Sequence, residues 1–213
     1  MNTPSEGTIT HSAALDRAFN AANQYQAALS AYSSGRYTEA MAMLDLLLQS
    51  QPFDADSHHL RGLIAFALKQ NQEALHWIRS AVAIQPCAAT FNTLCVVHTA
   101  CRDYESAIYS AQQGLTLQAD SAVLHYNMGL AMQLLGRLGE AATCYRSAIR
   151  FAPEHCAAHN NLGIVLKTFD QLNEAEHHFR HAVSANPDNC EARSNLGHVL
   201  LKMGHFTEAW PYF

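Results

Sequence analysis

The string "GRLGEA" at residues 136–141 belongs to a series that recurs along almost the whole chain. The members of the series are "GRYTEA" (35–40), "QNQEA" (70–74), "RDYESA" (102–107), "GRLGEA" (136–141), "DQLNEA" (170–175) and "GHFTEA" (204–209). Their closing alanines are Ala40, Ala74, Ala107, Ala141, Ala175 and Ala209, separated by 34, 33, 34, 34 and 34 residues. A period of about 20–50 residues is the signature of a repeat architecture, in which one supersecondary unit stacks on the next.

Two further positions keep the same interval. Twelve residues before each alanine lies a small residue, namely Ala28, Gly62, Cys95, Gly129, Gly163 or Gly197. Twelve residues after it lies Pro52, Pro86, Ala119, Pro153 or Pro187. We interpret each repeat as two antiparallel helices, A and B, with the small residue where the helices approach closely. Gly35, Gly136 and Gly204 would end helix A in the left-handed conformation, and proline would end helix B.

These residues resemble tetratricopeptide repeats (TPR) over nearly the whole chain. The resemblance implies an all-α fold, a right-handed α-solenoid of helix-turn-helix TPR units spanning residues 12–213. The repeats run about 21–54, 55–87, 88–121, 122–155, 156–189 and 190–213, the last one truncated. The departures are Ala119 in place of proline, Cys95 in place of glycine, and one repeat that is a residue short near Cys87.

Composition narrows the functional classes. The net charge is −5 and the Lys and Arg residues are scattered, so the clustered cations that nucleic-acid binding needs are missing. The longest apolar run, "LIAFAL" (63–68), is far shorter than the roughly 20 residues of a membrane helix. Because the N-terminus does not resemble a signal peptide and the six cysteines form no CxxC pair, we expect a cytoplasmic protein without membrane contact.

The two ends of the chain differ from the repeats. Residues 1–11 are polar and are expected to be disordered, and residues 12–34 could form a longer first helix. The sixth repeat stops at "TEAWPYF", where Pro211 should break helix B. An uncapped apolar edge there could support a homo-oligomer. Trp-Pro-x-Phe after such repeats also resembles the junction between TPR arrays and C-terminal transferase domains in some bacterial proteins.

An amide recurs on helix A beside a Leu-Gly or Met-Gly pair. We number the positions of each repeat from its first residue and call them slots. Slot six is held by Asn127, Asn161 and Asn195 in the last three repeats and by Gln26, Leu60 and Thr93 in the first three. An amide can donate to and accept from the backbone of an extended peptide. The three asparagines resemble the asparagine ladder of O-GlcNAc transferase, which implies peptide binding in the concave groove. The alternative is that they form hydrogen bonds within the solenoid or face water.

Slots five and nine would complete that groove. Slot five holds Tyr25, His59, Asn92, Tyr126, Asn160 and Ser194, and slot nine holds Leu29, Leu63, Val96, Leu130, Ile164 and His198. The candidate groove residues are therefore Asn127, Asn161, Asn195, Tyr126, Asn160, Asn92, Tyr25, His59 and His198. The aliphatic residues could instead pack only against a neighbouring helix. The Lys, Asn and Arg constellation of carboxylate-clamping TPR proteins is missing from these slots.

Metal and catalytic sites were also considered. Glu174, His177, His178 and His181 form one polar cluster, and His155, Cys156 and His159 form another. His177 and His181 have the i, i+4 spacing that can ligate zinc, but no further ligand is placed to close the shell. We interpret both clusters as solvated helix surface and predict no metal, no cofactor and no catalytic residue in this chain.

Three roles remain. The first is a protein–protein interaction scaffold that holds an extended segment of a partner in its concave groove. The second is the substrate-recognition region of a larger transferase whose catalytic domain is absent from this chain. The third is a self-associating assembly module.

Overall fold

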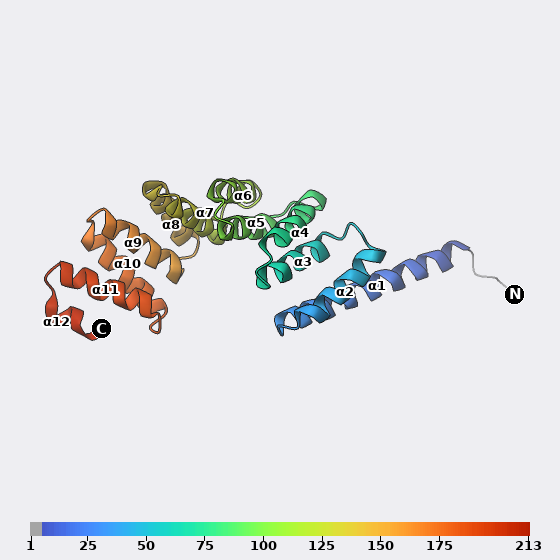
Figure 1. Cartoon of the computed structure of the whole chain (residues 1–213), viewed down its shortest axis with the longest axis horizontal. Coiled ribbons are helices and arrows are strands. Elements are labelled where there is room, and N and C mark those ends of the chain that lie inside the picture. The colour runs from blue at the N-terminus through green and yellow to red at the C-terminus, as the bar shows by residue number, and fades with distance from the viewer. Residues whose placement is uncertain (1–5) are drawn as a thin grey trace. The chain divides into compact units, whose positions relative to one another are not determined.

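The computed structural model describes residues 6–213, with side chains from Asn20 onward. Helices form because each repeat supplies two amphipathic segments separated by a short turn. The A helices are α1 (Glu6–Ser33), α3 (Ala55–Ala67), α5 (Ala88–Ala100), α7 (Ala122–Leu134), α9 (Cys156–Thr168) and α11 (Cys190–Lys202). The B helices are α2 (Tyr37–Ser50), α4 (Asn71–Ile84), α6 (Tyr104–Leu117), α8 (Leu138–Phe151), α10 (Leu172–Ala185) and α12 (Phe206–Ala209). Each A helix packs on the B helix that follows it, as Figure 1 shows, which confirms the predicted α-solenoid of helix pairs.

The chain divides into two compact units, each with its own core. The N-terminal unit comprises Met1–Pro86 and the C-terminal unit Cys87–Phe213. The boundary coincides with the repeat that is one residue short near Cys87. Helix α1 begins at Glu6, and residues 1–5 of the segment expected to be disordered lie outside the described residues.

In all six repeats, the turn between helix A and helix B contains one residue in the left-handed conformation, at the same position of the repeat. Gly35, Gly136 and Gly204 have φ values of 74°, 83° and 83°, which confirms their predicted role. The other three turns use Lys69, Arg102 and Asp170 at φ values of 64°, 61° and 59°. A side chain at positive φ is strained by about 1–2 kcal/mol, so the fold imposes this conformation even where glycine is absent.

Proline is not needed to end helix B. α2 ends at Ser50, two residues before Pro52, and α6 ends at Leu117, two residues before Ala119. The capping residues have nearly the same backbone conformation, with φ −133° at Gln51 and −143° at Gln118. The final helix is interrupted as predicted, because α12 ends at Ala209 and a 3₁₀ turn containing Pro211 follows.

The small residue of helix A lies where the approach of helix B leaves too little room for a Cβ atom, as predicted. A Cβ atom added at Gly163 would lie 2.7 Å from Cε1 of Phe179, and one added at Gly129 would lie 2.9 Å from Cε1 of Tyr145. In four repeats the space is occupied by a large side chain sixteen residues later, namely Ile78, Tyr145, Phe179 and Phe213, the last of which follows α12. The equivalent positions in the other two repeats are Ala28 with Leu44, and Cys95 with Ala111, where the residue of helix B is itself small.

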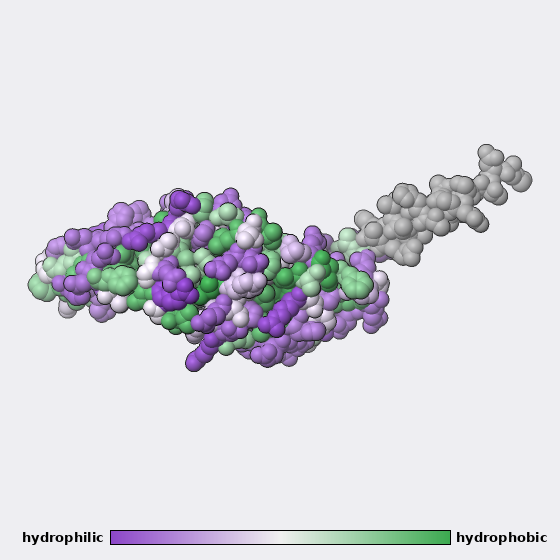
Figure 2. All heavy atoms as spheres, turned by 90° about the horizontal axis from the view of Figure 1, so that it is seen from above, coloured by the Kyte–Doolittle hydropathy of each residue, from purple (hydrophilic) through white to green (hydrophobic). Residues whose placement is uncertain are grey.

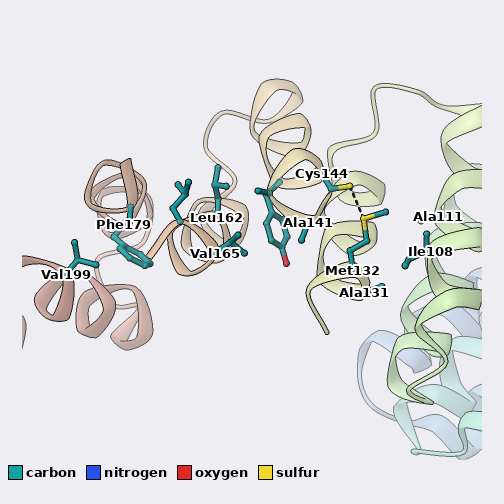
Figure 3. Close-up of a cluster of buried hydrophobic side chains, with 14 of the residues drawn as sticks. Ile108, Ala111, Ala131, Met132, Ala141, Cys144, Leu162, Val165, Phe179 and Val199 are labelled. Atoms are coloured by element: carbon teal, nitrogen blue, oxygen red, sulfur yellow. Dashed lines mark hydrogen bonds between the residues drawn. The ribbon is translucent and has the colours of Figure 1, made fainter. Parts of the chain in front are cut away.

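The core of the C-terminal unit runs through these contacts. Phe179 is fully buried and lies between Val199 and the side chains of Leu162 and Val165 (Figure 3). The Cys144 thiol donates to Met132 Sδ at 3.6 Å in the same cluster (Figure 3). Burying an aromatic side chain of this kind contributes about 1.5–3 kcal/mol relative to leaving it exposed.

The surface mixes polar and apolar side chains. On the face shown in Figure 2, apolar residues are interspersed among polar ones. Within the described residues, none of the helices combines the length and the hydrophobicity needed to cross a lipid bilayer.

Candidate functional site

The slot-six amides of the C-terminal unit hydrogen-bond to the preceding A helix. Asn127 Nδ2 donates to Asn92 Oδ1 at 2.7 Å, and Asn195 Nδ2 donates to Asn160 Oδ1 at 3.2 Å. Asn161 Nδ2 donates to the Tyr126 hydroxyl at 3.4 Å. Each bond joins slot six of one repeat to slot five of the repeat before it, 35 residues earlier. We call these three bonds the inter-repeat amide series.

Six of the candidate groove residues therefore bond to one another in pairs. Asn160 is only 4% exposed, and its Nδ2 also lies 3.2 Å from Oε1 of Glu191. Lys167 Nζ donates to Asn195 Oδ1 at 3.0 Å, so this amide has a donor and an acceptor engaged inside the stack. The predicted alternative, hydrogen bonding within the solenoid, thus describes these amide nitrogens.

Tyrosines extend the network into helix B. The Tyr145 hydroxyl donates to Gln133 Oε1 at 2.6 Å, and Asn161 Nδ2 lies 3.5 Å from the same hydroxyl. The Tyr126 ring lies 4.8 Å from the His155 ring, measured between centroids. Burial raises the pKa of Tyr126 and of Tyr145 above the ordinary value, so both hydroxyls stay protonated and remain donors.

Part of the A-helix face remains exposed. We define the A-helix face as slots five, six and nine of α5, α7, α9 and α11. Asn92, Asn127, Asn161 and Asn195 are half-buried there, and so are the slot-nine aliphatic residues Val96, Leu130 and Ile164. His198 is exposed, and its Nδ1 lies 2.6 Å from the Ser194 carbonyl oxygen. The face thus alternates amides held in place with partly exposed aliphatic side chains.

The N-terminal unit arranges the same slots differently. At slot six Gln26 is exposed and Leu60 is buried. Tyr25, at slot five, lines a cavity of about 300 Å³ together with Asp54 and Asp56. Burial and then these two carboxylates raise the pKa of Tyr25. Burial lowers the pKa of His59, while the nearby Asp56 carboxylate opposes that shift.

A recurring histidine was missed by the sequence analysis. His58, His125 and His159 hold slot four of their repeats, and each Nε2 lies 2.9–3.1 Å from a carbonyl oxygen six residues earlier. A carbonyl oxygen only accepts, so each Nε2 carries the proton. These bonds close the loop between helix B and the next helix A. Their signal in the sequence is the shared slot four, which differs from any metal-binding spacing.

Sequence families identify the repeats. Tetratricopeptide repeat families match residues 25–89, 122–155, 157–189 and 178–210, which together make up well over half of the chain. The chain is a tetratricopeptide repeat protein. No curated protein matches this TPR chain in sequence.

Solved TPR structures share the fold. PilF of Pseudomonas aeruginosa has a TM-score of 0.85 at 16% identity, over 92% of this TPR chain and 90% of that one. PilW, a widely conserved type IV pilus biogenesis factor, has a TM-score of 0.81 at 19% identity, over 90% of each chain. YrrB, a TPR protein with an unusual peptide-binding site, has a TM-score of 0.65 at 19% identity, over 79% of this chain and 88% of that one. Identities this low show the fold alone.

The two histidine-containing clusters noted in the sequence form specific contacts in the structure. Within the part of the chain that the structure describes, no group of three or more His, Cys, Asp or Glu residues is arranged to hold a metal ion. His155 Nδ1 accepts from the Ala158 backbone N–H at 3.2 Å and so caps α9. His178 is half-buried and contacts His159, which the interpretation as solvated surface did not anticipate.

Proposed function

We propose that this TPR protein is an interaction scaffold whose A-helix face binds an extended segment of a partner protein. TPR proteins act as protein-interaction scaffolds, and the finer assignment to this face is supported by its chemistry. The amides are held in place before a partner arrives, so their remaining hydrogen-bonding capacity is preorganised. This preorganisation is the observation that carries the proposal.

The spacing of the face suits an extended chain. Packed helices lie about 8–10 Å apart, and an extended chain advances about 3.3 Å per residue. One repeat therefore meets about every third residue of a bound segment. Val96, Leu130 and Ile164 would contact its apolar side chains, and the half-buried amides of Asn127 and Asn161 would contact its backbone.

The members of the face have separate roles in this proposal. Asn127, Asn161, Asn92 and His198 would contact the partner directly. The buried Asn160 and the engaged Asn195 would position their neighbours, and Tyr126 would hold Asn161 in place. Tyr25 and His59 belong to the N-terminal unit and would contact a separate part of the partner.

Charged substitutions at slot nine test this proposal. Leu130→Arg with Ile164→Arg would put two cations on the A-helix face, whereas Tyr109→Arg puts one on helix B, where Tyr109 is 62% exposed. Tagged wild type and both variants are used to capture partners from the native cell, with quantitative mass spectrometry and circular dichroism on each variant. We expect the double variant to lose partners that the Tyr109 variant keeps. Equal recovery by all three proteins, with folding intact, would overturn the proposal.

Self-association is a second candidate function, favoured by exposed aromatic side chains. Phe206, Trp210 and Phe213 are 67%, 78% and 63% exposed at α12 and the turn after it. Exposed apolar patches of this kind often mark interaction surfaces. If this surface mediates dimerisation, sedimentation equilibrium will show a concentration-dependent mass that Trp210→Ser abolishes. A monomer at all concentrations would exclude it.

A further inference from the structure

Four histidines from two helices are in mutual contact in the fifth repeat. His159 lies on α9, and His177, His178 and His181 lie on α10. The ring of His159 lies 5.1 Å from that of His178 and 5.0 Å from that of His181, and the rings of His177 and His181 are 4.6 Å apart. His159 is 5% exposed, so the cluster is part of the contact between the two helices.

Hydrogen bonds fix the tautomers of the two inner rings. His159 Nε2 lies 2.9 Å from the Pro153 carbonyl oxygen, which can only accept, so Nε2 carries the proton. Nδ1 of the neutral His159 ring must then accept. Its neighbour at 2.9 Å is His178 Nδ1, which must donate. The unprotonated Nε2 of His178 is left 3.9 Å from Oε1 of Glu174.

A positive charge is disfavoured in this arrangement. Protonation of His159 at Nδ1 would set two N–H groups against each other across the 2.9 Å contact unless the His178 proton moves from Nδ1 to Nε2, on the side of Glu174. Protonation of His178 at Nε2 would place a buried positive charge beside His159, His177 and the Arg146 guanidinium of α8, which the Glu174 carboxylate only partly offsets. Arg180 lines the same surface depression as His177 and His181, and its charge is paired with the carboxylates of Glu176 and Glu208. A positive charge on His159 itself is disfavoured by burial and by the nearby His181 and His177, whereas Glu154 favours it.

We propose that this four-histidine cluster is a proton-sensitive contact that holds α10 against α9 at neutral pH and weakens that packing in acid. The unfolded chain has no such obstacle, so its histidines take up protons near pH 6.5. In the folded protein, burial followed by the charge of His159 lowers the pKa of His178 to about 4. The unfolded state therefore binds more protons between these values, and the stability present at neutral pH is lost as the pH falls through this window. Asn160 and Asn161 directly follow His159 on α9, so we expect loosening of this packing to reach the A-helix face.

Replacing the titrating donor by a permanent one tests the proposal. In His178→Asn the amide Nδ2–H can take the place of the Nδ1–H without titrating. His205→Asn is the matched control, because His205 is exposed in the same unit. Urea unfolding is followed at pH 7 and pH 5 in the presence of EDTA. The folding equilibrium constants of wild type and the control should fall about twentyfold more than that of His178→Asn. An equal fall in all three would overturn the proposal.

Wild-type protein provides a second test if His178→Asn fails to fold. Long-range ¹H–¹⁵N NMR spectra report the tautomer and the titration of each ring. We expect His159 in the Nε2–H form, His178 in the Nδ1–H form, and faster amide exchange in α10 than in α8 when the pH falls from 7 to 5, after correction for intrinsic rates. A His178 ring in the Nε2–H form, or one that titrates at its ordinary pH without opening of α10, would contradict the proposal.

Discussion

The N-terminal and C-terminal units build the same helix pairs but join successive A helices with different chemistry. In the C-terminal unit, the inter-repeat amide series places a hydrogen bond between slot six of one A helix and slot five of the previous one. In the N-terminal unit, Leu60 is buried at slot six in an apolar cluster with Ala28 and Ala31 of α1, and the neighbouring Arg61 forms an ion pair with Asp45 of α2. Apolar contacts tolerate small shifts, whereas a buried polar pair specifies one register. The comparison teaches that one fold accepts either apolar or polar contacts between successive A helices.

The largest expected change in the free energy of unfolding comes from truncating the aromatic ring that packs against Gly163 in the C-terminal unit. Phe179 is fully buried against Gly163, so Phe179→Ala should lower the free energy of unfolding by about 3–5 kcal/mol. The matched change at Ile78 in the N-terminal unit removes fewer atoms and should cost about 2–4 kcal/mol. Urea unfolding monitored by circular dichroism measures both. A loss below about 1 kcal/mol for Phe179→Ala would mean that the ring is not the filler of the glycine slot.

An isosteric change at slot six sharpens the comparison. Asn127→Asp keeps the shape but replaces the donor to Asn92 by an acceptor, which should cost about 1–3 kcal/mol of unfolding free energy. Gln26→Glu makes the same change at the exposed slot six of the N-terminal unit and should stay within about 0.5 kcal/mol. Both are measured at pH 7, where the new carboxylates are charged. Equal costs would remove the distinction between the units.

The smallest effect is expected at the turns, where the two units are alike. Lys69→Gly in the N-terminal unit and Arg102→Gly in the C-terminal unit each relieve a side chain at positive φ. Each should raise the unfolding free energy by about 0.5–1 kcal/mol, after the greater entropy of the unfolded glycine chain is subtracted from the strain. Thermal melts at low scan rate provide the measurement. A decrease in stability for both would show that these side chains make contacts worth more than the strain.

The fold was predictable because several positions repeat with the same period. The alanine of helix B, the small residue of helix A and the turn glycines all keep the 34-residue interval, and the structure confirms the helix pairs that they predict. Helix ends were predictable where glycine or proline marks them. The turns at Lys69, Arg102 and Asp170 were not, because their conformation is imposed by the packing of the two helices rather than by a glycine.

The site was predictable only in part. Periodicity places slots five, six and nine on one face, but it does not say which side chain of the neighbouring repeat each amide meets. The asparagines at 127, 161 and 195 were predicted as peptide contacts, and peptide binding by them stays a prediction. Their bonds to slot five depend on a 35-residue offset that appears only when two A helices are stacked. The histidine contact between α9 and α10 likewise joins residues whose separation matches no metal or catalytic spacing.

A double-mutant cycle on Asn92 and Asn127 tests most directly whether the amides tie successive repeats together. The single changes Asn92→Ala and Asn127→Ala and the double change are compared with wild type by urea unfolding. The 2.7 Å bond between the two amides predicts a coupling free energy of about 0.5–1.5 kcal/mol, so the double variant should lose less than the sum of the single losses. Strict additivity would contradict the inter-repeat amide series, and with it the preorganised face on which the proposed binding depends.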